Sequence, residues 1–282
     1  MLVRKVIYSI LNLFDHHKEK IPNLFLQTFK KHPHLSRKDE QRIRVCVNEI
    51  IRYLGLIDHL IEVGSERKIR HINSKIINVL RLGIYELVFD DITPDFAAIH
   101  SNVELAKKNI NKKSSSMVNA VMRNIQRISQ KNRKLKMSLI KNKIDLAYPE
   151  WLLKKWKDEF GKDVTRNLCA EFLNKKDIFI RLDIDRYSVD KMISVLSHSN
   201  IKVIQHNQFK LFFKVVLGQK NILDNNLFQE GIISIQDPAA GAVVDLINPQ
   251  KNDFILDVCA APGTKSLFMA QRVGQGGRVF AC

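Results

Sequence analysis

The chain has 282 residues, 45% of them hydrophobic, which is enough for about two domains with buried cores. Its 46 Lys and Arg residues against 29 Asp and Glu give a formal net charge of +17, and its apolar stretches are far shorter than a membrane span. Because the apolar stretches are short, we expect no membrane association. The four cysteines, at positions 46, 169, 259 and 282, form no Cys-x-x-Cys pair, so we expect a reducing compartment and no metal site.

The first predicted element is an amphipathic helix over residues 1–14. Arg4 and Lys5 precede an apolar run, an arrangement that superficially resembles a signal peptide. However, Asn12 interrupts the run, a polar stretch follows at residues 15–20, and no small-residue cleavage site appears. We therefore expect a cytoplasmic protein.

Several apolar-striped helices are predicted up to about residue 130. Ser36, followed by Asp39 and Glu40, resembles the capping box that begins a helix. Thr93 and Pro94 are expected to supply the N-cap and the first-turn proline of a later helix. The predicted helices cover residues 36–53, 74–89, 93–110 and 115–128. Short connections between them favour an all-α bundle.

The positive charge is concentrated in the first half of the chain. Residues 1–140 hold 26 Lys and Arg against 13 Asp and Glu, whereas residues 231–282 hold four of each. Such a field is expected for a protein that binds a polyanion such as RNA. The alternative is that lysine is frequent because the coding sequence is rich in A and T. That alternative does not explain why residues 231–282 carry no net charge. Residues 130–143 contain six basic and no acidic residues. This segment is either an exposed linker or the end of a long helix.

The segment from 148 to 230 predicts a small α+β domain. Helices are expected over residues 149–160 and 188–197, and strands over residues 178–184, 201–204 and 210–217. Arg181 and Asp183 fall on the polar face of the first strand. Arg181 has two interpretations: an exposed arginine, which is the simpler one, or a contact to an RNA phosphate. Trp151 and Trp156 could stack on RNA bases, but their helical spacing favours the core.

A strand, a turn of small residues and a helix follow near the end of the chain. Residues 254–258 predict a buried strand, and a helix continues to residue 273. A glycine-rich turn then leads to a second strand at residues 278–282. This is the usual opening of an α/β nucleotide site, because small residues let the backbone approach a ligand and the helix start attracts an anionic group.

Two common nucleotide motifs are excluded at this turn. A Walker A loop needs glycine directly before its lysine, but Thr264 precedes Lys265. A dinucleotide fingerprint needs three glycines directly after the strand, where only Gly263 is present.

The string LDVCAAPGTKS at residues 256–266 resembles the S-adenosylmethionine motif of RNA cytosine-C5 methyltransferases, with Thr264 where that motif usually has glycine. Five more segments, in family order, resemble the small-subunit rRNA methyltransferase B family with its NusB-like N-terminal domain. They are VLRLGIYELVF at residues 79–89, residues 94–108, VNAVMR at 118–123, LAYPEWLL at 146–153 and GIISIQDPAAG at 231–241.

The resemblance implies a multidomain protein that is truncated within its S-adenosylmethionine-binding domain. The expected parts are an all-α NusB-like RNA-binding bundle (1–130), a basic linker (131–147), a small α+β domain that guides RNA (148–230) and the incomplete start of an α/β Rossmann-like methyltransferase domain (231–282). The implied cofactor-binding residues are Cys259, Ala260, Ala261, Pro262, Gly263, Thr264 and Lys265. The implied partner is small-subunit rRNA, with the protein acting in rRNA processing as a monomer.

The implied reaction is methyl transfer to cytosine C5 through a cysteine nucleophile. The family's two catalytic cysteines lie in Pro-Cys and Thr-Cys contexts, which do not occur here, so we expect no catalytic residue and no activity in this chain. Three interpretations stay open: part of a methyltransferase, a non-catalytic NusB-like RNA-binding protein with a degenerate methyltransferase stub, and a structural protein that docks on the ribosome.

Overall fold

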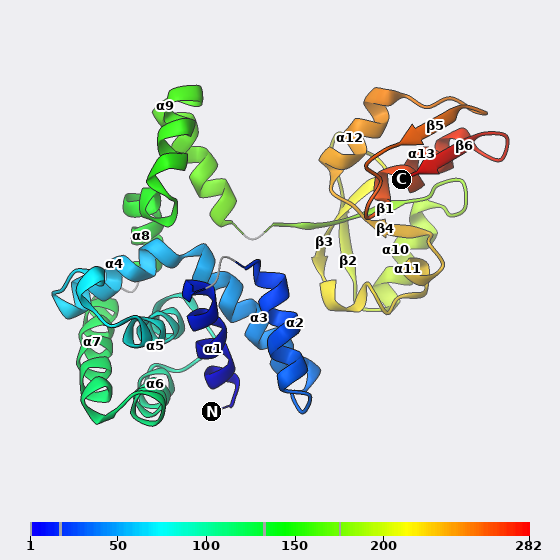
Figure 1. The fold of residues 1–282 in the computed structure, drawn as a ribbon. Coiled ribbons are helices and arrows are strands. Elements are labelled where there is room, and N and C mark those ends of the chain that lie inside the picture. The colour runs from blue at the N-terminus through cyan, green and yellow to red at the C-terminus, as the bar shows by residue number, and fades with distance from the viewer. Residues whose placement is uncertain (1, 17–18, 132–133, 175) are drawn as a thin grey trace. The chain divides into compact units, whose positions relative to one another are not determined.

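The computed structural model describes residues 2–16, 19–131, 134–174 and 176–282. The chain forms two compact units, Met1–Asn174 and Lys175–Cys282, which we call unit 1 and unit 2 (Figure 1). The expected order of an all-α bundle, a small α+β part and the start of an α/β part is confirmed.

The described elements of unit 1 are all helices. Nine are α-helices: α1 (Leu2–His16), α2 (Ile21–Lys31), α3 (Arg37–Arg52), α4 (Leu54–Ser65), α5 (Ser74–Ile84), α6 (Asp95–Asn109), α7 (Lys112–Lys131), α8 (Leu135–Lys143) and α9 (Glu150–Leu173). Shorter helical turns are η1 (Ile69–His71), η2 (Tyr85–Phe89) and η3 (Ile144–Ala147).

The helix starts show one confirmed cap and one wrong prediction. Ser36 and Asp39 form a reciprocal capping box, in which each backbone N–H donates to the other's side chain at 3.2 Å. Thr93, by contrast, does not cap α6, because Pro94 occupies the N-cap position. The Thr93 hydroxyl instead donates to Asp90 at 2.7 Å, and Arg42 binds the same carboxylate.

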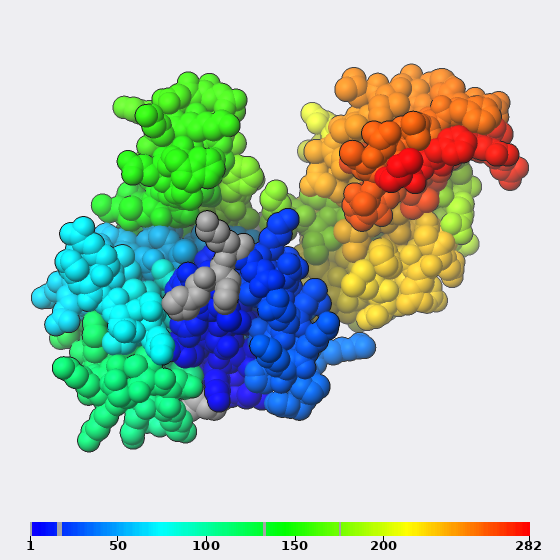
Figure 2. All heavy atoms as spheres, viewed as in Figure 1, coloured from blue at the N-terminus to red at the C-terminus, as the bar shows by residue number. Residues whose placement is uncertain are grey.

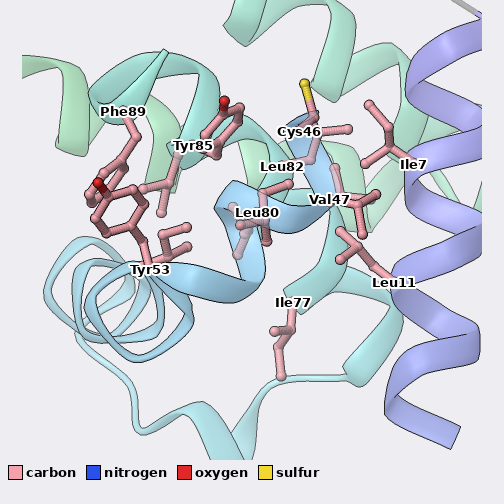
Figure 3. Packing of buried hydrophobic residues seen from close by; sticks show 14 of the residues in the cluster. Ile7, Leu11, Cys46, Val47, Tyr53, Ile77, Leu80, Leu82, Tyr85 and Phe89 are labelled. Carbon is pink, nitrogen blue, oxygen red and sulfur yellow. The ribbon is translucent and has the colours of Figure 1, made fainter. Parts of the chain in front are cut away.

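The core of unit 1 is organised around α5. Residues 77–84 of this helix are all buried, which is expected for a helix that packs on every side. Figure 3 shows Leu80 and Leu82 of α5 among Ile7 of α1 and Val47 of α3. The central position of α5 therefore fixes α1, α3 and α4 around it.

A polar network crosses this core at Arg81 of α5. Its Nε donates to Asp58 of α4 at 2.8 Å, and its Nη1 donates to Asp15 of α1 at 3.0 Å. Asn78 donates to Asp15 as well, at 2.9 Å. Because Arg81 is 9% exposed, the network joins three helices through a nearly buried charge.

Replacing Arg81 with methionine should destabilise unit 1 by about 2–3 kcal/mol, because Asp15 and Asp58 would keep their charges without a partner. The expected loss is less than for a fully buried pair, since these side chains are 25% and 21% exposed. Urea unfolding followed by far-ultraviolet circular dichroism measures the change. Arg123→Met, at an exposed position of α7, is the matched control and should stay within about 0.5 kcal/mol. Equal losses in both variants would contradict a stabilising network.

The basic segment 130–143 is divided between two helices. α7 ends at Lys131, residues 132 and 133 lie outside the described residues, and α8 then packs Leu135 and Leu139 into the unit 1 core. The Lys136 ammonium lies 5.6 Å from the ring centroid of Tyr53. The end of this segment is therefore folded against unit 1, with its remaining lysines outside.

Of the two tryptophans of α9 that were predicted to lie in the core, Trp156 packs against the unit 1 core and Trp151 does not. Trp156 is half-buried and stacks on Phe172 at 5.7 Å between ring centroids. Trp151 is 68% exposed, so its assignment to the core is wrong. The helix directs Leu153 inward, and a residue two positions away then points to nearly the opposite side. Gly161, with φ of 77°, breaks the helix in its middle.

Unit 2 begins with a four-stranded antiparallel sheet of order β2-β3-β1-β4. Its elements are β1 (Ile178–Leu182), α10 (Val189–His198), β2 (Lys202–Gln205), β3 (Phe212–Leu217), η4 (Gln219–Asn221), α11 (Asn226–Gln229) and β4 (Ile233–Ile235). One face of this sheet packs Ile180 and Leu182 with Met192 and Leu196 of α10.

The last elements are α12 (Pro238–Ile247), β5 (Phe254–Asp257), α13 (Thr264–Val273) and β6 (Arg278–Ala281). β5 and β6 pair in parallel, as expected for a strand-helix-strand unit. α12 and α13 pack on Phe212 of β3, which joins this part to the four-stranded sheet. The strand predicted for residues 254–258 is confirmed as β5, but its predicted burial is wrong, because Phe254, Leu256 and Val258 are more than 60% exposed.

Candidate functional site

The predicted cofactor residues lie together between β5 and α13. The strand ends at Asp257, residues 258–263 form the turn, and the helix starts at Thr264. Of the seven predicted residues, Cys259 to Gly263 therefore belong to the turn, and Thr264 and Lys265 to the first helical turn. We call residues 259–265 the cofactor loop.

Gly263 gives the cofactor loop its shape. Its φ is 99°, a conformation that a side chain strains, and its N–H donates to the Ala260 carbonyl at 2.6 Å. A Cβ built on Gly263 would meet no atom of the described chain within 4 Å. The space in front of this backbone is therefore open to a ligand.

Asp257 fastens the strand end to the helix start. Its Oδ1 accepts the Cys259 N–H at 3.2 Å, and its Oδ2 accepts the Ser266 hydroxyl at 2.7 Å. The Ala260 N–H also donates to the Cys282 carbonyl at 3.1 Å, which ties the loop to β6. The sequence prediction missed Asp257 and Ser266 as supports of the loop, although a carboxylate at a strand end and a hydroxyl in the first helical turn were available signals.

The start of α13 suits an anionic group. Gly263 is its N-cap and provides no side-chain cap, and no acidic residue lies in the first turn. The first N–H groups of a helix have no partner within the helix, and they carry the positive end of its dipole. A carboxylate or phosphate placed over the cofactor loop would thus meet donors and a favourable field.

The four cysteines divide into a buried and an exposed pair. Cys46 on α3 and Cys169 on α9 are buried, and burial raises the pKa of the Cys46 thiol to about 12. Burial also raises the pKa of Cys169. Neither thiol suits nucleophilic attack, because the thiolate is the reactive form. Cys259 and Cys282 are exposed; Cys259 is the first residue of the cofactor loop, and the Cys282 carbonyl is bonded to Ala260 of that loop.

A second candidate site is the basic surface of unit 1, which holds 33 Lys and Arg against 19 Asp and Glu. α7 buries Val118, Val121 and Ile125, whereas Arg123, Arg127 and Lys131 are exposed at four-residue spacing. The sequences of α7 and α8 contain no acidic residue. Both helices contribute to the surface of unit 1, in green in Figure 2. A row of cations without carboxylates is suited to RNA phosphates.

The described residues provide neither a membrane span nor a metal cluster. Across residues 2–16, 19–131, 134–174 and 176–282, no helix combines the length and the apolar character that a membrane crossing needs. In the described part of the chain, no group of three or more His, Cys, Asp or Glu side chains could hold a metal ion.

Two family matches cover most of unit 1 and the end of unit 2. Residues 1–127 match the NusB family, and residues 244–282 match the 16S rRNA methyltransferase RsmB/F family. The second match contains the cofactor loop.

Curated relatives align along nearly the whole chain. The probable ribosomal RNA small subunit methyltransferase B of Synechocystis is 30% identical over 90% of this chain. That of Bacillus subtilis is 27% identical over 91% of it. The chain spans 57% of the length of each of these two relatives.

A solved structure shows the same fold. The structure titled "Crystal Structure of PH0851" superposes with a TM-score of 0.61 at 19% identity, covering 99% of this chain and 63% of that one.

Proposed function

Because this chain belongs to the ribosomal RNA small subunit methyltransferase B family, we propose that the protein methylates C5 of a cytosine in small-subunit rRNA with S-adenosylmethionine as donor. The cofactor loop, in which an open-faced Gly263 precedes an uncapped helix start, is the observation that carries this proposal. We further propose a cytoplasmic protein that acts as a monomer.

The residues of the cofactor loop fit S-adenosylmethionine. When bound, this cofactor supplies an electrophilic methyl group. The backbone at Ala261 and Gly263 would face its methionine part, because both residues are small and the space at Gly263 is open. The N–H groups at the start of α13 would hold its carboxylate. Asp257 and Ser266 would keep the loop in place through their hydrogen bonds.

Unit 1 would supply the affinity for rRNA. Phosphate contacts provide the larger part of non-specific nucleic-acid binding, and unit 1 carries most of the net positive charge of the chain. The exposed row Arg123, Arg127 and Lys131 is the best-defined candidate contact. We propose that unit 1 binds the RNA and that the α+β part of unit 2 guides the target toward the cofactor loop.

The cysteine nucleophile is proposed for the whole protein and not for residues 1–282. Attack on C6 of a flipped-out cytosine needs an accessible thiolate. Cys46 and Cys169 are buried, Cys259 belongs to the loop proposed to hold the cofactor, and the Cys282 carbonyl accepts a hydrogen bond from that loop. We therefore expect the 282-residue chain alone to leave small-subunit rRNA unmethylated.

Transfer of labelled methyl from S-adenosylmethionine to small-subunit rRNA tests the proposal. The whole protein should produce 5-methylcytidine, detected by nucleoside mass spectrometry, and large-subunit rRNA should stay at background. Label in another nucleoside, or none in any, would refute the cytosine-C5 assignment. The 282-residue chain is the matched control and should remain at background.

A non-catalytic RNA-binding protein is the second candidate, and the concentration of charge in unit 1 favours it. It predicts RNA binding by the whole protein without any affinity for S-adenosylmethionine. Calorimetric titration of the cofactor into the whole protein separates the two candidates.

A further inference from the structure

Arg181 of β1 is buried, contrary to the prediction of an exposed polar face. It is 1% exposed, although its neighbours Ile180 and Leu182 point to the opposite face of the sheet. Arg181 pairs across the sheet with Phe212 of β3, and α12 and α13 cover that face. Period-two alternation correctly separates the two faces, but it does not reveal that helices from later in the chain cover the second one.

The guanidinium of Arg181 is held on three sides. Its Nε donates to Gln236 Oε1 at 2.7 Å, and its Nη1 donates to Gln271 Oε1. The guanidinium carbon lies 4.2 Å from the ring centroid of Phe268 on α13. Among the described residues, neither Nη2 of Arg181 nor Nε2 of Gln236 has a hydrogen-bond partner. Two buried donors therefore lack an acceptor, which is rare in folded proteins.

Within the described part of the chain, no carboxylate is bonded to the Arg181 guanidinium. Both of its acceptors are neutral amide oxygens. The nearby Asp183 accepts from Gln271 Nε2 at 2.9 Å and from the Asp185 N–H at 3.2 Å. Burial lowers the pKa of Arg181 to about 10, so the side chain is still cationic at neutral pH. A buried cation of this kind gains from an anionic ligand.

Arg181 lines a cavity of about 360 Å³ at the same place. The polar part of the wall consists of Arg181, Asp183, Asp185, Gln271 and Arg272. Arg272 is itself paired with Asp245 at 2.6 Å. Phe268 and Gln271 follow Lys265, the last residue of the cofactor loop, by three and six residues, which places this wall of the cavity about 4–9 Å along α13 from the loop. The cavity has no lining residue in common with the cofactor loop.

We propose that this cavity binds a singly charged phosphate diester of the RNA backbone, with the Arg181 guanidinium as its central cation. Asp183 and Asp185 in the same wall disfavour a phosphate monoester, which carries about 1.5 to 2 negative charges near pH 7. A diester carries only one charge. The assignment of RNA as its source rests on the proposed function, whereas the site itself can be tested with a small diester.

Gln236→Glu is the decisive substitution. It keeps the shape of the side chain, removes the donor without a partner, and gives Arg181 a bonded carboxylate in place of a neutral oxygen. The full chain should fold at least as stably as the original, while its dissociation constant for small-subunit rRNA should rise about tenfold and the slope of log affinity against log salt should fall by about one. Gln208→Glu makes the same change in net charge at an exposed residue and should change affinity less than about twofold.

A second experiment tests the site without RNA and uses dimethyl phosphate and inorganic phosphate as probes at matched ionic strength. Dimethyl phosphate should raise the thermal unfolding temperature of the unsubstituted chain, should do so more than inorganic phosphate, and should have no effect on Gln236→Glu. Protection by inorganic phosphate alone would overturn the diester assignment. Absence of protection by both probes would overturn the site, whether or not the substituted chain folds.

Failure of the two proposals can be told apart. If the chain binds no rRNA at all but dimethyl phosphate still protects it, the proposed function fails and the diester site stands. If Gln236→Glu folds normally and binds rRNA as tightly as the original chain, RNA is excluded as the source of the diester.

Discussion

Affinity of this protein for small-subunit rRNA should fall by about a thousandfold or more as salt is raised from about 50 to 200 mM, the loss expected for six or more phosphate contacts. The reason is the distribution of charge. Unit 1 carries 33 Lys and Arg against 19 Asp and Glu, and α7 and α8 contain no acidic residue. Filter binding across a salt series measures the slope.

Matched neutral variants locate these contacts. Replacing Arg123, Arg127 and Lys131 of α7 by glutamine should reduce the slope of log affinity against log salt by about two to three, since each phosphate contact contributes about 0.7 to 0.9. Replacing Lys202, Lys210 and Lys220 of unit 2 by glutamine removes the same charge from exposed positions and should change the slope little. A flat salt response would refute phosphate binding, and equal losses in both variants would refute its location on α7.

Gly263→Val should abolish binding of S-adenosylmethionine by the whole protein, with a loss of at least about a hundredfold. The φ of 99° is strained for valine by about 1–2 kcal/mol, which would distort the cofactor loop. The added methyl groups would also occupy the open space in which the methionine part of the cofactor is proposed to lie. Isothermal titration calorimetry with S-adenosylmethionine measures the affinity.

Gly274→Val is the control for this experiment. Gly274 has φ of 67°, and a Cβ there would likewise meet no atom within 4 Å, but it lies at the opposite end of α13. The backbone strain is thus similar and the distance from the cofactor loop is large. Affinity should stay near that of the original protein in Gly274→Val. Cofactor binding that survives in Gly263→Val would count against the loop as the cofactor site.

Local patterns predicted several elements correctly because their causes are local. The capping box at Ser36 needs only a hydroxyl and a carboxylate three residues apart, and the structure forms it. The order of strand, small-residue turn and helix at residues 254–273 likewise follows from neighbouring residues. The central helix α5 was predicted from its apolar spacing, although the spacing did not show that every side of it is covered.

The sequence by itself determined that the chain is an all-α part followed by α+β and α/β parts, that its charge is concentrated at the front, and that a turn of small residues lies between a strand and a helix at the cofactor loop. Periodicity and capping act over a few residues, so these features need no distant partner. Only the tertiary structure decided the environments of Thr93, Trp151 and Arg181. The environment of such a side chain depends on which other elements pack on it. Arg42 of α3 donates to the Thr93 hydroxyl at 3.3 Å, and α13 covers Arg181.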